Sequence, residues 1–126
     1  MAKPPKPTVA ELDLLRLLWR LGPSTVRQLH AEAQKEREIA PATVLRLLQI
    51  MHGKRLVVRD EAQRSHVYSP AQAQGMLQTG LLGDLIHRAF SGSGKALVLA
   101  ALQGGHVTPE ERREIEDFLR REGDQP

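Results

Sequence analysis

The spacing of apolar residues changes once along residues 1–70, from the three-and-four spacing of helices to the alternation of strands. Helical spacing begins near positions 8, 25 and 41. Two alternating runs follow, Leu56–Arg59 and Ser65–Tyr68, separated by the polar segment 60–64. Because side chains repeat every 3.6 residues in helices and every second residue in strands, this order predicts three helices and then a β-hairpin.

Capping signals mark where each predicted helix begins. Thr8 with Glu11, and Thr25 with Gln28, form capping boxes, in which each side chain accepts a hydrogen bond from the other residue's backbone N–H. Pro41 suits the first position of the third helix, because its missing N–H would have no partner there. Three helices followed by a hairpin predict a winged helix-turn-helix over residues 8–70.

The third helix, from position 41 to 53 or 54, is predicted to have two faces. Its buried stripe consists of Val44, Leu47, Leu48 and Met51. At about 100° per residue, the opposite face carries Ala42, Arg46 and Gln49, with Thr43 and Ile50 beside it. This polar face is free to meet a partner.

The positive charge is concentrated in the first part of the chain. Residues 1–70 hold 12 Lys/Arg against 7 Asp/Glu, a net charge of +5, whereas residues 71–126 hold 6 against 8, a net charge of −2. Such an asymmetry favours contact with phosphates by the first part. We therefore predict that the third helix and the hairpin contact double-stranded DNA through Ala42, Thr43, Arg46, Gln49, Lys54, Arg55, Arg59, Arg64 and His66.

Base contacts are predicted for the first two turns of the third helix, which enter the major groove first. Arg46 can form a bidentate contact with guanine, and Thr43 can meet a thymine methyl group or a phosphate. Gln49 lies one turn further along and is a weaker candidate.

Residues 71–126 have helical spacing throughout and are predicted to form a three-helix dimerisation domain. Gly75, Gly80 and Gly83 interrupt its first helix, which predicts fraying or the close approach of another helix. Residues 95–102 are apolar nearly all round, which predicts burial on several sides. The last helix begins with the capping box of Thr108 and Glu111. The predicted homodimer contacts are Leu77, Leu81, Leu85, Ala89, Leu97, Leu99, Leu102, Ile115, Phe118 and Leu119.

Composition narrows the classes of function. The chain has no cysteine, which excludes disulfides, thiol catalysis and thiolate metal sites. Its histidines lack metal-ligand spacing. The segment Ser91–Ala96 looks like a phosphate-binding loop, but Ala89 stands where the motif requires a glycine and Ala96 where it requires a hydroxyl residue. We therefore expect no enzyme, no metal and no cofactor. No apolar run has the length of a membrane span, residues 1–7 predict a disordered tail, and the cytoplasm is the expected location.

Two alternatives remain open. Winged helices also serve as protein–protein interaction modules without DNA binding, in which case apolar anchors are expected on the third helix. There the chain has Leu45 and Ile50 beside the polar side chains. A ligand-sensing regulator is the second alternative, although the C-terminal part is short for a roomy pocket.

The segments Ile39–Val44 and Arg64–Pro70 resemble the corresponding segments of the penicillinase and methicillin-resistance repressors, the BlaI/MecI family, with its copper-responsive CopY-type relatives. The resemblance covers nearly everything after the tail. It implies a winged helix with a helical dimerisation domain, and a dimer that binds an operator dyad and blocks transcription. It also implies a regulatory protease or another inducer system as a further partner.

The chain departs from the family pattern at several positions. Ala40 and Ala42 stand where members commonly have a hydroxyl residue and a lysine around the proline, so the operator sequence cannot be carried over. The lost cap costs about 1 kcal/mol. Arg55 replaces a usual glycine. Without cysteines the family's route to copper sensing is excluded, and Ala100–Ala101 stands where β-lactam-responsive members are cleaved between asparagine and phenylalanine.

Overall fold

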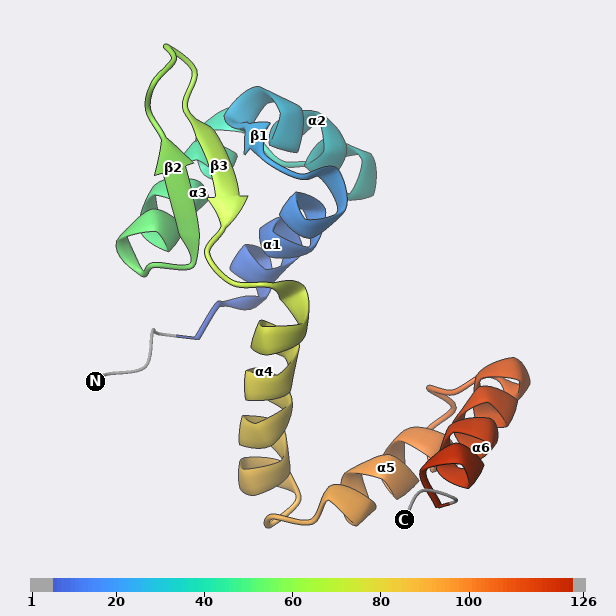
Figure 1. The fold of residues 1–126 in the computed structure, drawn as a ribbon. Coiled ribbons are helices and arrows are strands. Elements are labelled where there is room, and N and C mark those ends of the chain that lie inside the picture. Colours follow the sequence, from blue (N-terminus) through green and yellow to red (C-terminus); the bar gives the residue numbers. More distant parts are fainter. Residues whose placement is uncertain (1–5, 124–126) are drawn as a thin grey trace. The chain divides into compact units, whose positions relative to one another are not determined.

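The computed structural model describes residues 6–123, and the predictions for residues 1–5 and 124–126 lie outside the described residues (Figure 1). The elements in chain order are α1 (Val9–Leu21), β1 (Ser24–Thr25), α2 (Val26–Glu36), α3 (Pro41–Gly53), β2 (Val57–Asp60), β3 (Val67–Pro70), α4 (Gln74–Ala89), α5 (Gly94–Gln103) and α6 (Pro109–Gly123). They form two compact units, the first ending at Gln78 and the second beginning at Thr79.

The capping boxes of α1 and α2 confirm the predicted helix starts. The Thr8 hydroxyl accepts a hydrogen bond from the Glu11 N–H at 3.2 Å, and the Glu11 carboxylate accepts one from the Thr8 N–H at 2.9 Å. Thr25 and Gln28 repeat both bonds, at 3.2 and 2.9 Å. The cap after α1 is Gly22, whose φ of 85° lies in the left-handed region that glycine adopts without steric conflict.

The third helix also follows the prediction, because α3 begins at Pro41 and ends at Gly53. Ala40 precedes it without a side-chain hydrogen bond, as expected of a cap that lacks a hydroxyl. The predicted stripe is buried at Val44, Leu48 and Met51, whereas Leu47 is only partly buried at the edge of the core.

The three strands form one antiparallel sheet in the order β1-β3-β2. The sequence does not predict β1, because Thr25 is also the N-cap of α2 and two residues carry no alternating pattern. In the sheet they pair with Tyr68 and Val67 of β3. This pairing joins the start of α2 to the hairpin of residues 57–70, here called the wing (Figure 1).

The predicted hairpin is present, but both strands begin later than the sequence predicts, so the predicted bounds are wrong. Leu56 lies in the turn after α3, where its N–H donates to the Met51 carbonyl at 2.9 Å. On the other side, Ser69 and Pro70 extend β3 by pairing with the start of β2. Apolar alternation predicts the strands but not their ends, which hydrogen bonds to neighbouring elements decide.

The core of the first unit lies between α1, α2, α3 and the sheet. Its buried hydrophobic side chains, among the described residues, are Leu14, Leu15, Leu17, Leu18, Leu29, Ala33, Val44, Leu48, Met51, Leu56, Val57 and Tyr68. Trp19 and Leu77 pack against this cluster, and the Trp19 indole N–H donates to the Gln72 carbonyl at 3.0 Å. These contacts make the start of α4 part of the first unit, so the unit continues beyond the predicted boundary at position 70.

Helices α4, α5 and α6 contain no buried residue among those described. The three glycines do not interrupt α4, contrary to the prediction, since the helix is continuous from Gln74 to Ala89. A Cβ at any of them would meet no described atom within 4 Å beyond the nearby backbone of α4 itself, so no other described helix packs closely at these positions. The Thr108–Glu111 capping box of α6 is confirmed by bonds of 3.0 and 3.1 Å. Within residues 6–123, no helix combines the length and the apolar character that a membrane crossing requires.

Candidate nucleic-acid interface

The outer face of α3 carries the predicted base-reading residues. Ala42, Thr43, Arg46 and Gln49 are exposed, and together they are called the recognition face below. Buried Val44, Leu48 and Met51 hold the opposite side of the helix in the core. Because the helix is anchored along one side, its other side stands rigidly outward. Such a face can place hydrogen-bonding groups against base edges in a major groove.

Three predicted cations are available to a partner. Arg46 on α3, Arg55 in the turn after it and Arg64 in the wing loop are exposed. Within residues 6–123 none of the three belongs to an ion pair. Unpaired, solvated guanidinium groups can bind phosphates without first breaking an internal contact.

Arg55 has an unusual backbone conformation, with φ of 65°. A residue with a Cβ is disfavoured in this left-handed region by roughly 1–2 kcal/mol. Glycine adopts this conformation without that cost. In this chain the turn between α3 and β2 carries a cation instead.

Lys54 has an internal partner. Its ammonium group donates to both Glu11 carboxylate oxygens, at 2.8 and 3.1 Å. The Glu11 side chain is 2% exposed and the Lys54 side chain 26%. The bond therefore ties the end of α3 to the start of α1, a role that the sequence does not predict because the residues lie far apart in the chain. DNA contact by Lys54 stays a prediction.

The environment of Glu11 favours its charged form. Burial of the carboxyl group raises the pKa of Glu11, but the hydrogen bonds from Lys54 and from the Thr8 backbone outweigh that effect. The pKa of Glu11 is consequently lowered from its usual value of 4.5. The ionised carboxylate thus serves both the cap of α1 and the end of α3.

The other two predicted wing contacts are less exposed. Arg59 is paired with Glu61 at 3.1 Å, with 22% of its side chain exposed. A hydrogen bond with Tyr68, followed by the charge of Glu61, raises the pKa of Arg59, and its Nε atom is buried without a hydrogen-bond partner among the described residues. His66 is partly exposed just before β3. DNA contact by Arg59 therefore requires competition with Glu61.

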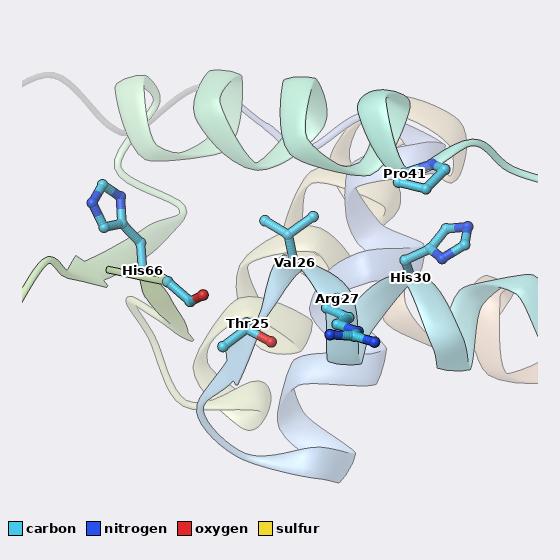
Figure 2. Close-up of a pocket in the computed structure, with 7 residues that line it drawn as sticks. Thr25, Val26, Arg27, His30, Pro41 and His66 are labelled. Carbon is cyan, nitrogen blue, oxygen red and sulfur yellow. The ribbon is translucent and has the colours of Figure 1, made fainter. Parts of the chain in front are cut away.

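A groove of about 480 Å³ opens beside the recognition face, between the start of α2, the start of α3 and the wing (Figure 2). Its lining residues are Thr25, Val26, Arg27, His30, Pro41, Ser65 and His66. Of these, only His66 is predicted from the sequence to contact DNA. The pairing of β1 with β3 brings Thr25 next to the wing, and the His30–Ile39 hydrogen bond ties α2 to the start of α3. No local pattern in the sequence predicts either contact.

The predicted dimer residues lie on all three helices of the C-terminal part. Leu85 on α4, Leu99 on α5, and Phe118 and Leu119 on α6 are among the exposed large hydrophobic residues. Leu77 differs, because it packs against the core of the first unit. Leu81, Leu97, Leu102 and Ile115 are partly buried, and Ala89 is exposed. Among the described residues no cluster of three or more potential metal ligands is found.

Comparison with known proteins matches this chain to repressors. The family model described as Penicillinase repressor matches residues 7–121. Over 84 residues the chain is 37% identical to "Transcriptional regulator BlaI" of Mycobacterium tuberculosis, a match that covers 65% of this chain and 61% of that protein. It is 20% identical over 112 residues to "Penicillinase repressor" of Staphylococcus aureus, covering 89% of each.

Solved structures show the same fold for the first part of the chain. The Bacillus licheniformis BlaI monomer, solved in complex with the blaP half-operator, superposes with a TM-score of 0.51 at 23% identity, covering 60% of this chain and 92% of that one. The DNA-binding domain of the repressor BlaI gives 0.52 at 23% identity, covering 59% and 90%. The mainly helical architecture with a small antiparallel wing is therefore a winged helix, as the sequence predicts. Since the family model spans residues 7–121, the chain belongs to the family described as Penicillinase repressor.

Proposed function

We propose that this chain is a homodimeric, sequence-specific DNA-binding protein that represses transcription by occupying an operator dyad. The observation that carries the proposal is the exposed recognition face of α3, with unpaired Arg46 on it and unpaired Arg55 and Arg64 on the elements that follow. The solved complex of the related BlaI with a half-operator supports the same use of this fold.

In the proposed complex, the first two turns of α3 enter the major groove. Arg46 donates two hydrogen bonds to a guanine, and Thr43 meets a neighbouring base or phosphate. Arg55 and Arg64 bind phosphates on either side of the groove and release their counterions. Binding then weakens as the salt concentration rises.

The exposed apolar residues of α5 and α6 support the dimer. Val98, Leu99, Phe118 and Leu119 are each more than two-fifths exposed. Two copies can bury these side chains against each other, since apolar surface of this kind is removed from water when it pairs. Joining two winged helices raises the effective concentration of the second at its half-site.

Two measurements on the full-length protein test the proposal. Selection from a random duplex library should enrich a sequence with two-fold symmetry, and its affinity should fall steeply with salt. A protein-docking winged helix would use exposed Leu45 and Ile50 of α3 instead, and it would enrich no sequence. If the affinity for duplex DNA does not change between low and physiological salt, the exposed arginines do not bind phosphates as proposed.

A further inference from the structure

The segment that leads from the wing into α4 is held to the first unit at three points. The Ala71 N–H donates to the Leu56 carbonyl at 3.0 Å. The Trp19 indole N–H donates to the Gln72 carbonyl at 3.0 Å, and Trp19 also packs against the core. Leu77, in the first turn of α4, packs against the same core. Trp19, Gln72 and Leu77 are together called the α4 anchor below.

The α4 anchor is narrow. Among residues 71–80 only Leu77 is partly buried, and the others are exposed. Trp19 lies 53 positions before Gln72, in the last turn of α1, so their bond joins distant parts of the chain. Because the anchor depends on one indole and one leucine, a single substitution at either position should loosen the start of α4 and leave α3 in place.

Helix α4 begins in the first unit and continues past Thr79, where the second unit begins. It is unbroken from Gln74 to Ala89. A continuous helix bends only gently, so its direction is decided where its first turn is held. The α4 anchor is at that turn, and it therefore controls how freely α4 moves against the winged helix.

We propose that the α4 anchor determines which spacings between half-sites the homodimer accepts, with Trp19 and Leu77 as positioning residues that do not contact DNA. Two joined winged helices bind a dyad tightly only when both recognition faces reach their half-sites at once. One added base pair moves a half-site by about 3.4 Å and rotates it by about 35° around the duplex axis. A firmly held α4 cannot follow this change, whereas a loosened α4 can. The inference rests on the proposed function and adds the choice of spacing to it.

The first test compares Leu77→Ala with Met76→Ala in the full-length protein. Met76 precedes Leu77 on the same helix turn and is 66% exposed, so it is the matched control. Affinity is measured for the selected operator and for the same duplex with one base pair added or removed between the half-sites. We expect the wild type and Met76→Ala to bind the altered duplexes about tenfold more weakly or worse, and Leu77→Ala to differ by less than about threefold.

Two further variants separate positioning from folding. Leu77→Met keeps the side-chain volume and should restore the wild-type discrimination between spacings. Trp19→Phe removes the indole N–H but keeps an aromatic ring, and it should also reduce this discrimination, which keeps the test available if Leu77→Ala does not fold. All variants should bind a duplex with a single half-site as the wild type does, because the recognition face is unchanged.

The α4 anchor can also be followed without DNA, because Trp19 is the single tryptophan of the chain. Loosening the start of α4 should expose the indole to water. Leu77→Ala should therefore shift the fluorescence emission to longer wavelength and increase its quenching by acrylamide. Met76→Ala should keep the spectrum and the quenching of the wild type.

The two proposals fail differently in these tests. If the wild type binds no symmetric duplex, the proposed function is wrong, and this inference is wrong with it. If the wild type binds the selected operator but accepts the altered spacings equally well, the inference alone is wrong. The same conclusion follows if Leu77→Ala and Trp19→Phe discriminate between spacings as strongly as the wild type.

Discussion

The two compact units differ in how they treat their apolar residues. The first unit buries leucines of α1, α2 and α3 together with Val57 and Tyr68 of the wing. Helices α4, α5 and α6 bury none of their described residues within the chain and expose Leu85, Leu99 and Phe118. The first unit thus has a core of its own, whereas the second leaves its large apolar side chains exposed. We therefore expect the first unit to fold alone and the second to require a partner.

Cutting the chain between the units is expected to have the largest effect. Residues 1–78 should unfold cooperatively as a monomer, because Trp19, Gln72 and Leu77 keep their contacts. Residues 79–126 alone should show little helix at low concentration. Circular dichroism and sedimentation equilibrium measure both fragments, and the affinity of 1–78 for the selected operator should fall about 10²- to 10⁴-fold. If the 1–78 fragment is a dimer, the dimer interface lies in the first unit and the proposed assignment is wrong.

A charge within the second unit should separate the copies without cutting the chain. Leu99 is 43% exposed on α5, and Leu99→Asp would place an unpaired carboxylate in the proposed dimer interface. Gln103→Asp, at an exposed polar position of the same helix, is the matched control. We expect a monomer for Leu99→Asp and a dimer for the control by sedimentation. If both variants are dimers, this face of α5 is not part of the dimer interface.

Within the first unit, the Glu11–Lys54 pair should contribute to stability. Glu11→Ala removes a buried carboxylate that accepts from the partly exposed Lys54 ammonium and from the Thr8 N–H, and should lower the free energy of unfolding by about 1–3 kcal/mol. Asp13→Asn removes the surface pair with Arg16 and should change it by less than about 1 kcal/mol. Chemical denaturation compares the two, and equal losses would mean that burial adds nothing to the Glu11 pair.

The pH dependence of the same pair has a definite sign. Because the pKa of Glu11 is lowered in the folded state, its contribution is complete above the unfolded value of 4.5. It is lost as the pH falls through the lower, folded pKa. In thermal melts below pH 4.5, the difference in melting temperature between the wild type and Glu11→Gln should therefore narrow as the pH falls. A gap that widens toward acid would reverse the assigned direction of the shift.

Substitutions on the recognition face should have a smaller effect, on DNA affinity alone, because these exposed side chains do not contribute to the core. Arg46→Ala should weaken binding to the selected operator by about 1–3 kcal/mol and relax preference at one position per half-site. Arg64→Ala should weaken operator and random DNA by the same factor. Parallel titrations on both duplexes decide, and a uniform loss for Arg46→Ala would reduce it to a phosphate contact.

The helices and the buried stripe of α3 could be predicted because capping boxes and apolar spacing are local signals. Three features depend on residues distant in sequence and could not be. Strand β1 exists only through its pairing with β3, Lys54 meets Glu11 across the core, and Arg27 reaches the groove because β1 places α2 beside the wing. Leu77 shows the same limit, since its apolar character fits a dimer seam and the first core equally well.

The left-handed turn at Arg55 affects the folding stability of the first unit. Glycine at this position would relieve about 1 kcal/mol of backbone strain. Arg55→Gly should therefore raise the free energy of unfolding by that amount in a denaturant titration, while its salt dependence on DNA becomes shallower by about one phosphate. At this turn we therefore expect arginine to lower the folding stability and to raise the affinity for DNA. Because this strain lowers the stability of the first unit, Arg55→Gly should raise the folded fraction most in variants whose core is already weakened.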